Sequence, residues 1–187
     1  MRRILNNNTF CIMKKFAFAA LIASLSSIAC AADVYVGAGF NQLNIDIDGG
    51  QSLNPTAINL IVGTEVTPNF AVEGRLYTSL ADDSIRVSNT TSVDIGLDHA
   101  EGVYAKGILP INEQVSAYGL LGYTNGALKA SVGNTSVTSD DDSDVSYGAG
   151  MTFKVNKQVG INLEYARMFT GSDYHIDNIG ASLTYRF

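Results

Sequence analysis

Two histidines, His99 and His175, are the side chains of this 187-residue chain that could supply an imidazole for acid–base chemistry. His175 and Asp177 are two residues apart, so an extended strand would place them on one face, where a serine would complete a hydrolytic triad. Position 173 is an aspartate, and Ser172 would point the other way unless a loop turned it back. We therefore expect no catalytic site and no enzyme, with Ser172 as a weak candidate only.

The acidic segments could hold a divalent cation. Asn44, Asp46 and Asp48 resemble the start of a calcium-binding loop, but Pro55 stands where the bidentate glutamate is required. The run 139–144 could gather Ca²⁺ or Mg²⁺ beside lipid phosphates, although solvated loop charges explain it more simply. We therefore expect no metal site and no cofactor.

The charge is distributed unevenly along the chain. It carries 12 Lys and Arg against 18 Asp and Glu, and four of the basic residues but none of the acidic ones lie in residues 1–31. Residues 32–187 therefore hold eight basic and 18 acidic residues, a net charge of −10. Such a chain repels a phosphate backbone, which excludes nucleic acid as a partner.

Residues 1–31 have the layout of a secretory signal peptide. Lys14 and Lys15 precede an apolar stretch at 16–28, which is followed by the small residues at 29–31. The apolar stretch is too short to span a bilayer as a helix. We therefore predict cleavage near residue 31 and export from the cytoplasm.

Cleavage would leave a single domain, residues 32–187. Met13 is a possible true start of the chain, and lipid modification of Cys30 is the competing interpretation of the leader. Cys11 and Cys30 both lie in the removed part, so no disulfide is expected in the exported protein.

Alternation with period two is the main structural signal in residues 32–187. It is clearest at the end of the chain, where five apolar residues alternate with polar or small ones without exception. These apolar residues are Ile179, Ala181, Leu183, Tyr185 and Phe187. Similar alternation recurs upstream, and it weakens at 34–44, 93–109 and 115–124, where strands are predicted from spacing and Gly/Tyr content. The total is eight strands of about ten residues. Glu101, out of phase with Lys106, indicates a bulge or a wrong register. Even with Gly and Tyr counted as apolar, no uninterrupted apolar run within 32–187 exceeds seven residues, so no transmembrane helix is predicted there.

The connections between these strands alternate in length. Three are short, at 67–69, 110–114 and 156–158, and four are long and polar, at 46–56, 80–92, 126–144 and 171–177. Short turns at one rim and long loops at the other are typical of an outer-membrane barrel, whereas a soluble barrel or sandwich has no need for this asymmetry. The sequence thus predicts an all-β fold, an eight-stranded antiparallel up-and-down transmembrane β-barrel.

These features resemble the small eight-stranded outer-membrane barrels of Gram-negative bacteria, which include the OmpA-like transmembrane domain and porin-family surface proteins. The resemblance covers residues 33–187. It is most specific in the last strand, where Leu183, Tyr185 and Phe187 match the C-terminal pattern that the barrel-assembly machinery recognises in this family. A second match, 67–75, is similar to the family's first periplasmic turn and third strand. The resemblance implies a place in the cell outer membrane and contact with its lipid and lipopolysaccharide. Unlike full-length OmpA, the sequence offers no segment for a peptidoglycan-binding domain after the barrel, so we expect no anchoring to the cell wall.

Seven charged residues should point into the lumen of the predicted barrel. They are Glu65, Glu73, Arg75, Lys106, Lys154, Glu164 and Arg186. An eight-stranded barrel is just wide enough for side chains to fill it, so these three anions and four cations should pair across the lumen and close it. A polar solute channel or proton path is the alternative, which we disfavour because water-filled pores use more strands.

Outward aromatic residues should form two girdles at the membrane boundaries, because their rings favour the interface between acyl chains and headgroups. The girdle residues are Phe70, Tyr123, Tyr147, Phe153 and Tyr165. Arg167 shares the outward phase of Tyr165, which is tolerable only near the loop rim, where a long cationic side chain can reach water.

The sequence therefore favours a non-enzymatic integral outer-membrane protein with a closed polar lumen. It would contribute to envelope integrity and meet host or other surface ligands through its loops. The first alternative is a narrow porin-like channel for small solutes or apolar ligands. A lipid A-modifying enzyme is less favoured, because the His-x-Ser arrangement of similar deacylase barrels is missing at His99 and His175. A secreted soluble β domain is a further alternative, which would dissolve without detergent.

Overall fold

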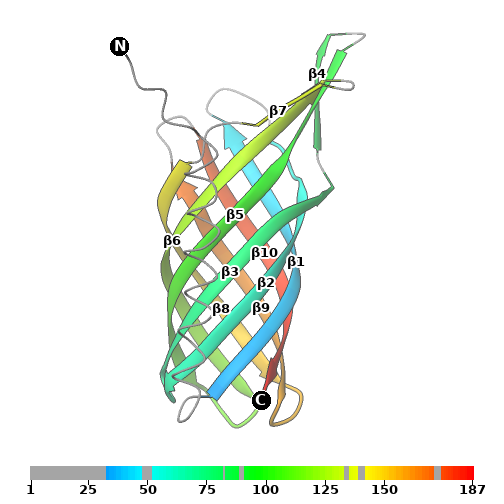
Figure 1. The fold of residues 1–187 in the computed structure, drawn as a ribbon. Helices are drawn as coiled ribbons and strands as arrows, with labels where there is room; N and C mark the ends of the chain where they lie inside the picture. The colour runs from blue at the N-terminus through cyan, green and yellow to red at the C-terminus, as the bar shows by residue number, and fades with distance from the viewer. Residues whose placement is uncertain are drawn as a thin grey trace, which may run out of the picture. The chain divides into compact units, whose positions relative to one another are not determined.

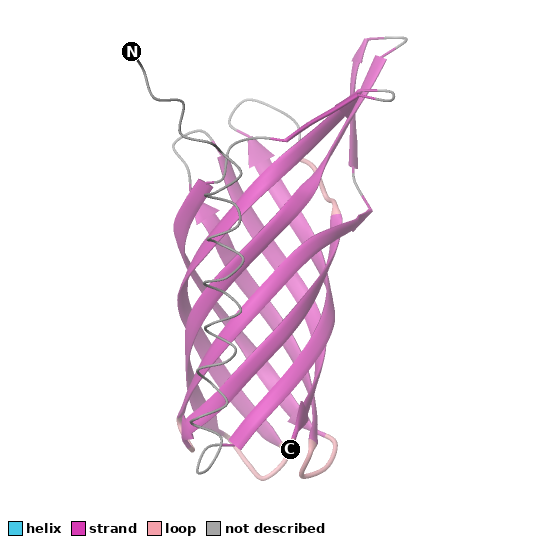
Figure 2. Ribbon diagram, in the orientation of Figure 1, coloured by secondary structure: helices cyan, strands magenta, loops and turns pink. Residues whose placement is uncertain are grey.

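The computed structural model describes residues 33–47, 52–81, 83–88, 91–132, 135–138, 142–170 and 174–187. The predicted signal peptide, residues 1–31, lies outside this part, as do Ser172 and residues 139–141 of the acidic run. Every regular element of the described chain is a β-strand (Figure 2). Among these residues no helix is long and apolar enough to span a membrane.

Eight long strands form one closed antiparallel barrel (Figure 1). In chain order they are β1 (Asp33–Ile47), β2 (Thr56–Thr67), β3 (Phe70–Ala81), β5 (Thr91–Pro110), β6 (Val115–Val132), β8 (Asp142–Lys154), β9 (Val159–Thr170) and β10 (Tyr174–Arg186). Each pairs with the next in this order, and β10 pairs with β1 along 13 residue pairs from Tyr35 with Arg186 to Ile47 with Tyr174. The pairing of first and last strands closes the sheet, which confirms the predicted fold.

Two further short strands extend one hairpin beyond the barrel. They are β4 (Asp83–Ser88), which pairs with β5, and β7 (Thr135–Thr138), which pairs with β6 (Figure 1). The assignment of 80–92 and 126–144 wholly to loops was therefore wrong. In a membrane strand, apolar side chains that face lipid alternate with polar or small side chains that face the lumen. A hairpin outside the membrane needs no such alternation, so β4 and β7 lack the pattern by which the other strands were predicted.

The three short connections lie at the opposite end, which we call the inner end, while the long connections mark the outer end. Two of these turns are built in the same way around an asparagine. The Asn112 side-chain oxygen accepts hydrogen bonds from the backbone N–H groups of Gln114 and Val115 at 2.9 and 2.8 Å. Asn156 accepts two in the corresponding positions, both at 2.8 Å. Each asparagine thereby replaces backbone pairing that the tight turn cannot supply.

Residues along each barrel strand alternate between lipid and lumen. In β10, Ile179 and Leu183 are 64% and 54% exposed on the outside, whereas Asn178 on the inside is 1% exposed. The outer faces of the other seven barrel strands are also predominantly apolar, so together they form the continuous apolar belt that hydrocarbon requires.

Glu101 lies on the outer face of β5, opposite in phase to the buried Lys106, as the alternation indicated. The expected irregularity is present, but it falls between Leu97 and His99, nearer the outer end. Glu101 pairs with Asn125 on β6, two residues beyond Tyr123 in the outer direction. Its carboxylate is therefore placed at the outer boundary of the apolar belt, where water is accessible.

Glycines on the inner face make room for tyrosine rings that cross the lumen. A Cβ atom at Gly63 would lie 2.4 Å from Cζ of Tyr35, and one at Gly150 would lie 2.4 Å from Cζ of Tyr118. At Gly150 the Leu163 carbonyl oxygen would also be only 2.5 Å away, so the ring could not escape the clash by rotating alone. Both glycines are needed for space.

Gly150→Ala should lower the free energy of unfolding by about 1–3 kcal/mol, because the added methyl overpacks the lumen against Tyr118. The matched control is Gly107→Ala on the outer face, where an added Cβ has no atom within 4 Å. The control should change stability by less than about 0.5 kcal/mol. Urea unfolding in lipid vesicles, followed by far-UV circular dichroism, measures both; equal losses would contradict the proposed packing role of Gly150.

Candidate functional site

A buried guanidinium at the centre of the lumen joins carboxylates from opposite walls. Arg75 on β3 donates through Nε and Nη2 to Oε2 of Glu73 at 2.8 and 2.5 Å. Its Nη1 and Nη2 atoms also donate to the two carboxylate oxygens of Glu164 on β9 at 2.6 and 2.9 Å. Strands β3 and β9 stand four places apart in the ring of eight, so this forked contact ties the barrel across its diameter.

Glu73 collects further donors from two other strands. The Tyr35 hydroxyl of β1 donates to its Oε1 atom at 2.6 Å, and the Lys106 ammonium of β5 donates to the same atom at 2.9 Å. The Lys106 ammonium also lies 4.1 Å from the ring centre of Tyr118 on β6, whose hydroxyl donates to Glu164 at 3.0 Å. We call these six residues, Tyr35, Glu73, Arg75, Lys106, Tyr118 and Glu164, the central network.

The charges of the central network balance. Its two carboxylates face two cations, and Glu73, Arg75 and Lys106 are 1%, 2% and 6% exposed. Transfer of these charged groups out of water costs free energy. The arrangement is stable because each charged group is hydrogen-bonded to a group of opposite charge. The network therefore fills the lumen with mutually satisfied polar groups.

The remaining predicted lumen residues lie nearer the inner end. Glu65 on β2 and Arg186 on β10 form a separate ion pair. Lys154 departs from the expectation: its side chain is exposed at the end of β8 and makes no ion pair with any described residue. The lumen thus contains a four-charge network and a separate pair, and Lys154 belongs to neither.

An apolar cluster closes the lumen toward the outer end, and the sequence analysis missed it. We call this cluster the outer plug: Leu43, Ile45, Leu53, Ala57, Tyr77, Leu97, Ala100, Met168, Phe169 and Ile176. Leu53 comes from the connection after β1 and folds back against Ile45 through two backbone hydrogen bonds, at 2.8 and 3.0 Å. The inward phase of Leu43 and Ile45 in β1 was a usable sign of this plug.

The five predicted girdle residues all lie on the outer face, from 38% exposed at Phe153 to 56% at Tyr123. Phe70 and Phe153 are near the inner end, and Tyr123, Tyr147 and Tyr165 are near the outer end. In the last strand, Leu183, Tyr185 and Phe187 are also outward, and the Tyr185 and Phe187 rings meet edge to face at 5.3 Å. Recognition of this strand by an assembly machinery stays a prediction.

Arg167 is outward, as expected, and is paired at the outer rim. It donates from Nε and Nη2 to the two carboxylate oxygens of Asp177 on β10, at 2.7 and 2.9 Å. The pair lies at the outer end of the barrel, where Arg167 stands opposite Tyr147 of the outer girdle. The outward position of Arg167 agrees with its phase in the sequence, whereas its pairing with Asp177 could not be predicted from that phase.

The two histidines do not form a hydrolytic set with described residues. The His175 Nε2 atom lies 3.2 Å from a carboxylate oxygen of Asp46 on β1, and the His99 Nδ1 atom lies 3.0 Å from Asp98. Ser52 donates to Asp46 rather than to a histidine. Within the described ranges, no group of three or more His, Cys, Asp or Glu residues is placed to hold a metal ion.

The family model of the outer membrane protein beta-barrel domain matches residues 16–187. The chain belongs to this family. It is an integral protein of the cell outer membrane, which removes the soluble β domain from the alternatives. In this family the short turns face the periplasm, so the inner end of the barrel opens to the periplasm and the outer end to the cell surface.

Members and neighbours of this family include attachment invasion locus proteins. The chain is 32% identical over 169 residues to the attachment invasion locus protein of Yersinia enterocolitica, with 83% of this chain and 91% of the relative covered. It is similar to the crystal structure of Ail, the attachment invasion locus protein of Yersinia pestis, with 25% identity, a TM-score of 0.63 and coverage of 83% and 99%. Neisserial surface protein A, at 15% identity, a TM-score of 0.65 and coverage of 82% and 97%, shares the fold.

Glu73→Gln should lower the free energy of unfolding by about 3–5 kcal/mol, because it leaves an uncompensated charge in the lumen. The control Glu113→Gln changes an exposed turn and should shift stability by less than about 0.5 kcal/mol. Adding Lys106→Met to Glu73→Gln restores neutrality and should recover part of the loss. Urea unfolding in vesicles tests this, and a Glu73→Gln variant as stable as the parent would contradict a pairing role for the central network.

Proposed function

We propose that this protein is a closed scaffold that presents its outer segments to ligands at the cell surface, and that these ligands are cationic. Charge distribution is the observation that carries the proposal. The outer-end segments 46–56, 80–101, 126–144 and 167–177 contain 13 of the 18 acidic residues and three of the 12 basic ones. The rest of residues 32–187 contains five of each and is neutral.

The whole net charge of −10 is thus carried by the end of the barrel that faces the surroundings of the cell. A charge of one sign gathered at one end attracts ligands of opposite sign over about 8 Å at physiological ionic strength and repels ligands of the same sign. Basic segments of proteins and cationic peptides fit this field. Contact of the same segments with lipopolysaccharide would require divalent cations between the two negative surfaces.

A surface-binding role is supported by the kinship with attachment invasion locus proteins, while the ligand class is argued from this chain alone. The Ail protein of Yersinia pestis has been crystallised in complex with the heparin analogue sucrose octasulfate, a polyanion. A polyanion does not suit outer segments with ten more negative than positive charges. We propose that this chain keeps the surface role and differs in the charge of its ligand.

We propose no transport function and no enzymatic activity. The outer plug and the central network occupy successive levels of the lumen, and neither leaves a polar path. The histidines pair with carboxylates at the outer rim, which argues against the lipid A-modifying alternative. Delivery to the membrane by the barrel-assembly machinery, guided by the last strand, belongs to the same proposal.

In nanodiscs without anionic lipid, the outer end of the protein should bind a cationic probe, poly-lysine, and should not bind sucrose octasulfate. Asp140→Asn with Asp141→Asn should weaken poly-lysine binding severalfold, because it removes two carboxylates from the acidic sequence between β7 and β8. The matched control, Asp33→Asn with Glu113→Gln, removes two inner carboxylates and should have no effect. Biolayer interferometry at two salt concentrations measures this, and tight binding of sucrose octasulfate would refute the cationic-ligand proposal.

Planar bilayers containing the folded protein should show no steady conductance, because the outer plug and the central network obstruct the lumen. Deletion of plug side chains by Leu43→Ala with Met168→Ala should not by itself open a current, since the network beneath remains intact. A stable current through the parent protein that Arg75→Ala enlarges would favour the channel alternative instead.

A further inference from the structure

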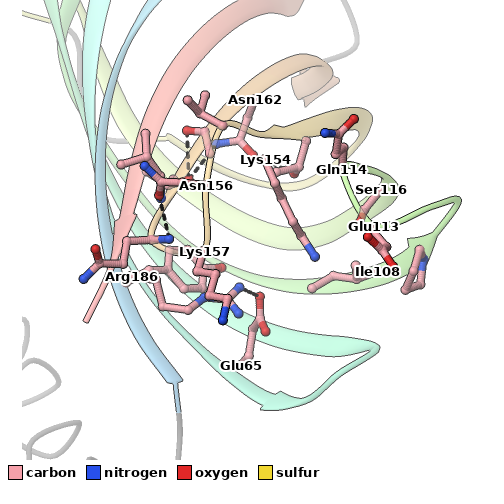
Figure 3. Close-up of a pocket in the computed structure, with 18 of the residues that line it drawn as sticks. Glu65, Ile108, Glu113, Gln114, Ser116, Lys154, Asn156, Lys157, Asn162 and Arg186 are labelled. Atoms are coloured by element: carbon pink, nitrogen blue, oxygen red, sulfur yellow. Dashed lines mark hydrogen bonds and ion pairs between the residues drawn. The ribbon is translucent and has the colours of Figure 1, made fainter.

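The inner end of the lumen contains a cavity that neither the closed scaffold nor the surface role uses. It has a volume of about 570 Å³ and is lined by the inner ends of the strands together with the short turns (Figure 3). Lys106 and Tyr35 of the central network form part of its lining, and it opens on the periplasmic side. We call it the inner cavity.

Cations outnumber anions around the inner cavity. Lys106, Lys154, Lys157 and Arg186 line it, against Glu65 and Glu113. Arg186 is paired with Glu65, and Lys106 with Glu73, so these two are already neutralised. Lys154 and Lys157 form no ion pair with any residue that the structure describes, and the Lys154 side chain extends into the opening (Figure 3). Glu113 is likewise outside any ion pair with described residues, so the recess has a surplus of one positive charge, in contrast to a domain whose overall charge is strongly negative.

A buried hydroxyl provides a second, independent indication of a ligand. Ser116 lines the inner cavity and is 2% exposed, and its Oγ atom has no hydrogen-bond partner among the described residues. Buried hydroxyls almost always have a partner, because an unpaired one loses its hydration without compensation. Ser116 pairs with Thr152, two residues before Lys154 on the same face of β8, so the hydroxyl and the ammonium arise from adjacent places on the wall.

We propose that the inner cavity binds a small oxyanion of the phosphate type from the periplasm. Lys154 and Lys157 supply the charge, and the Ser116 hydroxyl, whose oxygen is covered by the wall, turns toward the anion to donate a hydrogen bond. Ammonium groups on flexible stems recognise charge rather than the planar shape of a carboxylate, so pyrophosphate should bind more tightly than phosphate, and phosphate more tightly than acetate. Because the lysines are partly hydrated, dissociation constants for inorganic phosphate should be in the millimolar range, of the order of 1 mM.

The proposal can be tested by NMR titration of the folded protein in maltoside micelles, which contain no phosphate. Inorganic phosphate and pyrophosphate should cause saturable shifts of amide signals at 114–116 and 154–160. Sodium chloride at equal ionic strength should not. Lys154→Gln, Lys157→Gln and Ser116→Ala should each weaken binding about two- to fivefold. Lys129→Gln, on the outer extension of β6, removes the same charge at the far end and should have no effect.

Two controls exclude misfolding of the variants and distinguish the possible sources of the anion. Lys157 lies in an exposed turn, so its replacement should leave the barrel and its heat-dependent gel mobility intact. Short-chain phosphatidylglycerol added to the micelles tests lipid phosphate: the same shifts would identify a headgroup as a source of this anion, and their absence would assign the site to a free one. Shifts that do not saturate, that sodium chloride reproduces, or that survive both lysine replacements unchanged would overturn the proposal. Each of these outcomes is independent of ligand binding at the outer end.

Discussion

Every backbone N–H and C=O group in hydrocarbon must find its hydrogen-bond partner within the protein, and the architecture of this barrel follows from that requirement. A sheet meets it only by closing on itself, which the pairing of β1 with β10 achieves. Closure of eight strands fixes a narrow lumen, and the strands must then alternate between side chains that suit lipid and side chains that fit inside. Fold and composition are two results of one constraint.

Closure satisfies the backbone groups, but it leaves polar side chains buried in a narrow lumen, where they also need hydrogen-bond or charge partners. Charges at the centre of the lumen cannot reach bulk water, so they must be matched, and Arg75 meets this demand by bridging Glu73 and Glu164 across the barrel. Tyrosine rings fill the space between them, and glycines on the facing walls provide the room. The result is a lumen in three levels: an apolar outer plug, a neutral central network and a cationic inner cavity.

Because the lumen is closed, contact with the surroundings passes to the two ends of the barrel. The outer end carries the entire net charge of the domain, and the inner end exposes the cavity beside Lys154. Attachment invasion locus proteins share the scaffold, but a shared scaffold does not determine ligands. The residues at the two ends can differ between such proteins while the barrel stays the same. Segments outside the membrane do not have to pack against lipid or inside the lumen, as the barrel strands do.

The sequence by itself determined the barrel and the phase of those strands in which the alternation is clear, because lipid imposes a period of two that survives in the residue order. It also indicated which charges enter the lumen. Only the tertiary structure decided their partners: Lys154 stays outside the network, and Arg167 finds Asp177 on the neighbouring strand. Pairing and the outer plug depend on strand stagger and on a connection that folds inward at Leu53, and neither is encoded in local alternation.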